Sequence, residues 1–297
     1  MRIRHTIWGG LLLALAACSG GGGGGGGTTL APAAGPPSFD NATGTKTFQA
    51  TSVVGTYSAD LTTGSTGHSN LSPSTQIIVN FDTGTIRILV SQLTDAGATI
   101  LFDQTFGAGD LIGSANGFLF FQNAGGELLI YDAQTNPTGL KYTNFGVWGA
   151  GTTAIPVGAA AIGFVTNAGN LPTTGTARYE GQTIGLGVEA GAAFGIAGLV
   201  TLDANFGTGA ITGLFHDMVR SDQDQNLSAF EDMAVAASIN AGTSTYSGAL
   251  SSARPGFSSG DVEGAFFGPN AEETGGTWRL KADTGDDAYG GSYGATQ

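Results

Sequence analysis

The apolar residues of this chain come in short runs, a pattern that is typical of β-strands. Beyond residue 46, stretches such as TQIIVNF (75–81), TIRILV (85–90) and GELLIYDA (126–133) are separated by Gly, Asn and Asp. The best helix candidate, FEDMAVAASINAG (230–242), alternates as readily as it turns. The sequence therefore predicts an all-β fold.

The C-terminal half holds enough candidate strands to close a barrel. Eight antiparallel strands close a small barrel that is filled by its own side chains. Glycine occupies 52 of the 297 positions, which suits the bends of a tight closure. We expect a β-rich N-terminal subdomain at residues 46–170 and a barrel at residues 171–297, divided near the polar stretch NAGNLPTTGT (167–176). The candidate barrel strands are 176–185, 196–206, 209–218, 231–241, 243–251, 261–268, 274–282 and 288–296.

One hairpin sequence occurs twice in the chain. NFDTGTI (80–86) recurs as NFGTGAI (205–211), each time after one candidate strand and before another. Either a β-rich chain has reused a favourable hairpin, or two subdomains are built on a similar one. The sequence leaves both interpretations open.

The N-terminus has the pattern of a targeting segment. A basic start is followed by an apolar stretch from Ile7 to Leu15, which is shorter than the roughly 20 residues needed to span a bilayer. The only cysteine of the chain, Cys18, ends the sequence LAAC, which resembles a bacterial lipobox. This resemblance implies a signal peptide at residues 1–17, a lipid (palmitate-type acyl chains) on Cys18, and, because Ser19 follows, an outer-membrane location at the cell surface. The alternative is an ordinary secretory signal that contains a cysteine.

A glycine-rich segment follows the lipobox. Gly20 to Gly27 are consecutive glycines, which have no side chains to bury and a large backbone entropy. We expect residues 18–45 to be a tether between the lipid anchor and the folded body.

Charge and motifs exclude several classes of function. The formal net charge is −13, so phosphate backbones repel the chain and we expect no nucleic-acid partner. A single cysteine excludes an intramolecular disulfide and a Cys-based zinc site. The chain has no Gly-x-Ser-x-Gly elbow and no His-Glu-x-x-His motif. We therefore expect neither an enzyme nor a cofactor.

Two weak candidates for ligand sites remain. After the leader only His68 and His216 are present, and His216 is the weak candidate for binding haem iron; the competing interpretation is an ordinary surface histidine. SDQDQNLSAFED (221–232) resembles a calcium loop at Asp222, Asp224 and Asn226, but it has Leu227 where the sixth-position glycine belongs. We expect a solvated acidic loop there, and no metal site.

We expect a β-hairpin at residues 264–278, GAFFGPNAEETGGTW. Phe266 and Phe267 are successive strand residues, so one should point into the barrel and the other to the opposite face. Glu272 and Glu273 fall at the expected turn and should be solvated. As neighbours in an extended chain they make a poor acid–base pair.

The same stretch closely resembles the signature of the transferrin-binding protein B β-barrel family, and YTNFGVW (142–148) and LDANFGTGAITG (202–213) resemble further family segments. The resemblance implies a surface lipoprotein lobe with an N-terminal handle of strands (residues 46–170) and a C-terminal eight-stranded barrel, in which the signature is structural. The chain has one lobe, whereas transferrin-binding members have two. The matching residues are Gly264, Phe266, Phe267, Gly268, Pro269, Ala271, Glu273, Gly275, Gly276 and Trp278.

The resemblance also implies a function. A single-lobe member is expected to bind a host or environmental ligand such as an iron- or haem-carrying protein, with a TonB-dependent receptor as a further partner. The ligand-binding residues stay unknown beyond His216. The alternative is a structural or adhesive surface protein with no small-molecule ligand.

Overall fold

The computed structural model describes residues 36–58, 74–94, 97–132, 139–150, 154–189, 192–222, 224–284 and 288–297. These residues form β-strands and two short 3-10 turns, η2 (Ala108–Asp110) and η3 (Ala168–Asn170). None of the described segments is a helix with the length and apolarity that a membrane crossing needs. The predicted all-β fold is confirmed.

The N-terminal strands form two antiparallel sheets, which we call the handle. β1 (Thr45–Gln49) and β2 (Thr51–Ser58) follow each other in sequence but pair in different sheets, so the chain crosses from one sheet to the other at Ala50. The four-stranded sheet has the order β1 (Thr45–Gln49), β3 (Ser74–Asn80), β4 (Thr85–Thr94) and β5 (Gly97–Phe106). The six-stranded sheet has the order β2 (Thr51–Ser58), β10 (Ala154–Gly163), β9 (Thr143–Gly149), β8 (Gly126–Tyr131), β7 (Phe118–Asn123) and β6 (Leu111–Ala115).

The C-terminal strands form one closed antiparallel barrel. The pairing of β12 (Ala192–Asn205) with β13 (Ala210–Ser221) closes the sheet, and the short strand β14 (Leu227–Ala229) pairs only with β13. Each of the eight predicted strands is present, which confirms the eight-stranded barrel; β14 was not predicted. The barrel strands are β11 (Thr176–Glu189), β12 (Ala192–Asn205), β13 (Ala210–Ser221), β15 (Met233–Ile239), β16 (Thr245–Ser252), β17 (Ser259–Phe267), β18 (Glu273–Lys281) and β19 (Ala288–Thr296).

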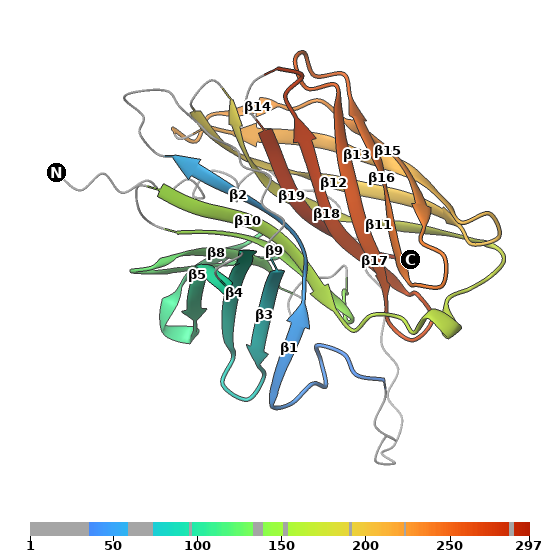
Figure 1. The fold of residues 1–297 in the computed structure, drawn as a ribbon, viewed down its shortest axis with the longest axis horizontal. Coiled ribbons are helices and arrows are strands. Elements are labelled where there is room, and N and C mark those ends of the chain that lie inside the picture. The colour runs from blue at the N-terminus through green and yellow to red at the C-terminus, as the bar shows by residue number, and fades with distance from the viewer. Residues whose placement is uncertain are drawn as a thin grey trace.

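The molecule has three layers, with the six-stranded sheet between the four-stranded sheet and the barrel (Figure 1). β9 is buried along its whole length, as expected for a strand that is covered on both faces. Phe145 and Val147 belong to the apolar cluster that includes Ile184 and Ala197 of the barrel. Trp148 faces the other way and stacks on Phe102 of the four-stranded sheet, with ring centroids 4.5 Å apart. The handle therefore has two apolar clusters of its own and shares a third with the outer wall of the barrel.

The repeated hairpin sequence forms the same turn twice. The side-chain Oδ1 atoms of Asn80 and Asn205 each accept hydrogen bonds from the backbone N–H groups two and three residues later, at 3.0 and 3.1 Å. Gly84 and Gly209 have φ angles of +66° and +74°, which favour glycine. One hairpin lies in an open four-stranded sheet and the other closes the barrel. This difference favours reuse of a local turn over two similar subdomains.

The folded region starts earlier than the predicted end of the tether at residue 45. The ring of Phe39 lies 5.7 Å from that of Phe48, 5.9 Å from Phe81 and 5.5 Å from Phe164, measured between centroids. Its backbone N–H donates to the carbonyl of Lys141 at 2.7 Å. This earlier start of the folded region could not be predicted from the sequence, because one Phe in a Gly- and Pro-rich segment gives no strand signal.

Candidate functional site

The signature stretch forms a hairpin between β17 and β18. β17 ends at Phe267 and β18 begins at Glu273, so the predicted hairpin is confirmed. Gly268 and Ala271 have φ angles of +88° and +64°, and Ala271 is fully buried. The carbonyl of Ala271 accepts hydrogen bonds from the hydroxyl of Tyr179 and the side-chain amide of Gln297, each at 2.7 Å. The hairpin thus ties together the first and last strands of the barrel.

The two phenylalanines of the hairpin point to opposite faces of the barrel wall, as predicted. Phe266 lies inside, with its ring centroid 5.4 Å from those of Phe206 and Tyr246. Phe267 faces the handle, where it packs so closely that a Cβ atom added to Gly163 would lie 2.5 Å from its ring. Both phenylalanines are buried.

The prediction that Glu273 is solvated was wrong. Its side chain is buried, with 2% of the residue surface exposed. Its carboxylate accepts hydrogen bonds from the backbone N–H groups of Lys141, Tyr142 and Thr143 at 2.6, 3.0 and 2.8 Å. Burial raises the pKa of Glu273, although these three hydrogen bonds act in the opposite direction. Glu273 therefore fastens the handle to the barrel.

Glu272 behaves differently from its neighbour. It is half-buried, and its carboxylate accepts hydrogen bonds from the backbone N–H and the side-chain amide of Asn270, at 2.8 and 2.9 Å. It therefore stabilises only the local turn. The two carboxylates are therefore held by different groups of the chain.

Small residues let the handle approach the barrel closely. Handle strands β2, β9 and β10 pack on β18 and β19. A Cβ atom on Gly294 would lie 2.7 Å from the ring of Phe145, so a side chain there would collide with the handle. Ser292 donates a hydrogen bond to the carbonyl of Gly146 at 2.8 Å across the same contact. The glycines of β19 thus have a packing role in addition to their role in bending the barrel.

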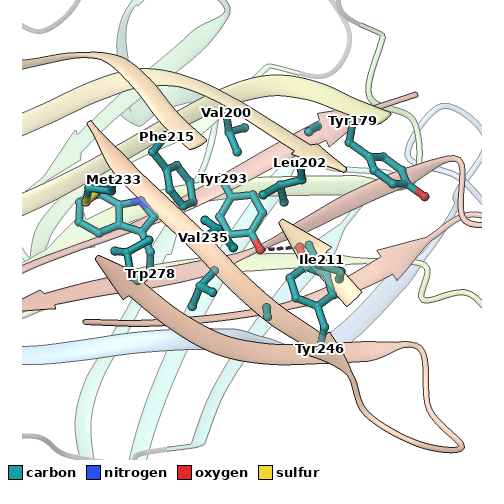
Figure 2. Packing of buried hydrophobic residues seen from close by; sticks show 14 of the residues in the cluster. Tyr179, Val200, Leu202, Ile211, Phe215, Met233, Val235, Tyr246, Trp278 and Tyr293 are labelled. Carbon is teal, nitrogen blue, oxygen red and sulfur yellow. Dashed lines mark hydrogen bonds between the residues drawn. The ribbon is translucent and has the colours of Figure 1, made fainter. Parts of the chain in front are cut away.

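The barrel interior is filled by aromatic and aliphatic side chains (Figure 2). The hydroxyl of Tyr246 lies 2.5 Å from that of Tyr293 and 2.8 Å from that of Thr274, so the buried phenols satisfy one another. Burial raises the pKa of Tyr246 to about 12. At the opposite end of the interior, the indole N–H of Trp278 donates to Thr183 at 2.7 Å. The barrel interior is therefore occupied by the side chains of the chain itself.

A buried arginine closes one end of the barrel. Arg254, in the connection from β16 to β17, has 8% of its surface exposed. Its guanidinium donates to the carboxylate of Glu231 at 2.7 Å and also to that of Glu189. Glu189 in turn accepts from Tyr289 at 2.5 Å and from Arg220 at 2.7 Å. We call these five residues the barrel-end network.

Aromatic rings surround the buried guanidinium of this network. The guanidinium carbon of Arg254 lies 4.9 Å from the ring centroid of Phe230, 5.7 Å from that of Phe257 and 5.6 Å from that of Tyr289. Cation–π attraction of this kind strengthens when the cation is desolvated. The network holds two arginines and two glutamates, so its formal charges balance. The ion pairs and hydrogen bonds of the network therefore link the ends of β11, β13 and β19.

The structure places His216 on β13, half-buried, with both ring nitrogens near protein partners. Nε2 lies 3.0 Å from the hydroxyl of Thr201, and Nδ1 lies 2.9 Å from the carboxylate of Asp217. His68 lies outside the described residues, so the structure does not bring the two histidines together. An iron would have to displace one of the partners of His216.

The acidic loop after β13 binds its own backbone. Asp222 accepts hydrogen bonds from the backbone N–H groups of Asp224 and Asn226 at 2.9 and 2.8 Å, and from the side-chain amide of Asn226 at 3.0 Å. These bonds, led by that from the Asn226 side chain, lower the pKa of Asp222. In the described part of the chain, no three His, Cys, Asp or Glu side chains are grouped to hold a metal ion.

The fold and these contacts define a class of protein: a handle of two β-sheets packed on a closed, side-chain-filled eight-stranded β-barrel. Residues 171–297 match the family model described as the C-lobe and N-lobe β-barrels of Tf-binding protein B. These residues form a transferrin-binding protein B-like β-barrel domain. Comparison with curated protein sequences gave no match.

Several solved structures are similar to the chain. Transferrin-binding protein B from Haemophilus parasuis Hp5 is 13% identical, with 85% of this chain and 76% of that chain covered and a TM-score of 0.46. A protein described as a surface lipoprotein is 14% identical, with 82% and 97% covered and a TM-score of 0.41. The N-lobe of lactoferrin-binding protein B from Moraxella bovis is 11% identical, with 86% and 100% covered and a TM-score of 0.34.

The barrel-end network was not predicted from the sequence. Arg254 lies in the segment SSARPGF (251–257), where an arginine beside a proline reads as an exposed turn residue. One signal in the sequence pointed to it. The chain has only 10 Lys and Arg residues, so an arginine between two apolar strands is a candidate for a buried charge. Its carboxylate partners could not be inferred, because Glu189 at the end of β11 lies 65 residues and Glu231 in the connection before β15 lies 23 residues from it in sequence.

Proposed function

We propose that this chain is an outer-membrane-anchored surface lipoprotein that captures a large ligand, an iron- or haem-carrying protein. The observation that carries the proposal is the match of residues 171–297 to the barrels of a protein named for binding transferrin. The proposed mode of action is non-enzymatic: the handle and barrel present their loops and outer faces to the ligand.

The packing of the barrel supports a ligand that binds outside the barrel interior. Tyr246, Tyr293 and Trp278 occupy the interior and satisfy their polar atoms within the chain. The barrel-end network covers one end with a buried Arg254. A ligand would therefore bind to the outside of the molecule, and a TonB-dependent receptor is the partner that would receive its iron or haem.

The proposed anchor is tested at Cys18, which lies outside the described residues. Cells that express the full chain are labelled with a palmitate analogue, and the protein is recovered from the outer membrane. We expect the wild type to carry the label and Cys18→Ser to lack it. Equal labelling of both proteins would contradict the lipid anchor.

The proposed ligand is tested by a capture experiment. The full-length protein is solubilised in detergent, immobilised, and exposed to serum and to mixtures of haem proteins, and the bound proteins are identified by mass spectrometry. We expect enrichment of an iron- or haem-carrying protein over empty beads. Recovery of no such protein would leave the structural or adhesive alternative as the better account.

A further inference from the structure

The connection between β16 and β17, residues 253–258, reaches across one end of the barrel, and we call it the strap. Its residues Arg254 and Phe257 are buried. The ring of Phe257 packs on Tyr289 of β19, with ring centroids 5.2 Å apart, and the guanidinium of Arg254 reaches Glu189 at the end of β11. In the sheet order, β18 and β19 separate β17 from β11. The strap therefore lies over the barrel interior at this end.

The first fastening of the strap is an ion-paired arginine. Arg254 donates hydrogen bonds to the carboxylates of Glu189 and Glu231, and these two residues are its ion-pair partners in the described part of the chain. Its buried Nε atom has no hydrogen-bond partner among the described residues. A buried cation that loses its carboxylate partners is strongly destabilising. Arg254 therefore holds the strap in place only while these carboxylates are ionised.

The second fastening is the carboxylate of Asp283, which follows β18. It accepts hydrogen bonds from the backbone N–H and the hydroxyl of Ser258 at 3.0 and 2.6 Å. The backbone N–H of Asp283 donates to the carbonyl of Gly256 at 2.7 Å. The hydrogen bonds from Ser258 hold the pKa of Asp283 below its ordinary value. Carboxylates therefore fasten the strap near its start and at its end.

Acid removes both fastenings. The charged and titratable groups around Arg254 come from four elements and are Glu189 of β11, Arg220 of β13, Glu231 before β15 and Tyr289 of β19. Burial raises the pKa of Glu189, but hydrogen bonds from Tyr289 and Arg254 and the charges of both arginines outweigh it, so the folded-state pKa lies below 4.5. The stabilisation from Glu189 and Asp283 is present above the unfolded-state pKa and is lost as the pH falls through the folded-state value. Once both glutamates are protonated, the two arginines have no carboxylate partner in the network.

We propose that the strap is an acid-released closure, which covers the barrel end at neutral pH and opens as its carboxylate partners become protonated, while the barrel strands stay paired. The strands are held by backbone pairing and by a core of mainly apolar side chains, and acid changes neither. Opening removes Phe257 from the barrel end and uncovers the rings of Phe230 and Tyr289, on which Arg254 and Phe257 pack. The barrel end then presents aromatic side chains and unpaired arginines in place of a charge-balanced closure.

The test measures amide hydrogen exchange of the full-length protein by mass spectrometry, with protection expressed relative to the intrinsic exchange rate at each pH. The reporters in the strap are the backbone N–H groups of Phe257 and Ser258, which donate to Arg254 and Asp283. The internal control is β15, a central strand of the barrel. We expect the strap to lose its protection as the pH falls from 7 to below 4.5, while β15 keeps its protection. A strap that is unprotected at pH 7, that stays protected in acid, or that loses protection only together with β15 would overturn the proposal.

A double variant reproduces the protonated state at neutral pH. Glu189→Gln combined with Glu231→Gln removes both carboxylates that bind Arg254, so the strap should lose its protection at pH 7 while β15 stays protected. The matched control is Glu263→Gln, which changes an exposed glutamate of β17 outside the network and should leave the strap protected. A strap that stays protected in the double variant, or that opens equally in the control, would refute the fastening. Should the double variant fail to fold, the acid titration of the unchanged protein decides the point.

Discussion

The carboxylate of Glu273 accepts hydrogen bonds from three consecutive backbone N–H groups that lie 130 to 132 residues earlier in the chain. Such a contact joins the barrel to the handle through a single side chain. These N–H groups would lose their partner if the carboxylate were absent, and the loss is most costly for the buried N–H of Thr143.

The first prediction compares the two neighbouring glutamates. Glu273→Gln replaces the carboxylate with an amide whose NH2 group faces N–H donors, so we expect the free energy of unfolding to fall by about 1–3 kcal/mol. Glu272→Gln, at the half-buried turn, should change it by less than about 0.5 kcal/mol. Urea unfolding of the two variants measures both values. Equal effects would show that Glu273 is not the fastening that the contacts indicate.

The second prediction concerns the two phenylalanines beside it. Phe266 fills the barrel interior and Phe267 fills the contact with the handle, and both are buried. Truncation of either to alanine should lower the free energy of unfolding by about 3–5 kcal/mol. Thermal unfolding followed by circular dichroism checks this. A melting temperature near that of the wild type for either variant would contradict its placement.

At the scale of single elements, the hairpin between β12 and β13 provides a matched pair of glycines. Gly209 has a φ of +74°, whereas Gly207 has no positive φ and has space for a Cβ atom. We predict that Gly209→Ala lowers the free energy of unfolding by about 1–2 kcal/mol, the cost of a left-handed conformation for an L-residue. Gly207→Ala should be close to neutral in the same denaturation experiment. A reversed order would refute the turn geometry.

The barrel-end network should make stability depend on pH. Burial alone would raise the pKa of Glu189, but hydrogen bonds from Tyr289 and Arg254 and the nearby guanidinium charges outweigh it and lower the pKa below 4.5. A carboxyl whose pKa is lowered by folding stabilises the protein above its unfolded-state pKa, and this stabilisation is lost as the pH falls through the folded-state value.

The corresponding prediction compares the wild type with Glu189→Gln. The wild type should melt at a higher temperature at pH 7, and the difference should shrink as the pH falls below 4.5. Melting curves of both proteins across this range test it. A difference that is constant with pH would mean that the charge of Glu189 does not contribute.

The strands themselves could be predicted because their signals are local. Alternation places Met233, Val235 and Ala237 of β15 inside the barrel, and Asn with Gly marks the hairpin turns at 80–84 and 205–209. β14 was missed because three exposed residues carry no alternation. Glu273 and Arg254 were missed for a different reason: their partners are far away in sequence, and a charged residue near a turn is usually solvated.

At the scale of the whole molecule, the middle sheet contributes to buried apolar clusters on both of its faces. β9 is buried on both faces, so it contributes Phe145 to the contact with the barrel and Trp148 to the core between the handle sheets. Glu273 and the glycines of β19 then hold the barrel wall against it. The outer faces and loops are the surfaces to which we propose that a ligand binds.

The most direct test of that claim is capture at the cell surface. Cells that express the wild-type chain are incubated with fluorescent holo-transferrin, lactoferrin and haemoglobin, and surface fluorescence is measured by flow cytometry. We predict saturable binding of at least one of these proteins, and its loss in cells that express Cys18→Ser. Binding no greater than that of cells without the chain, for all three ligands, would contradict the account.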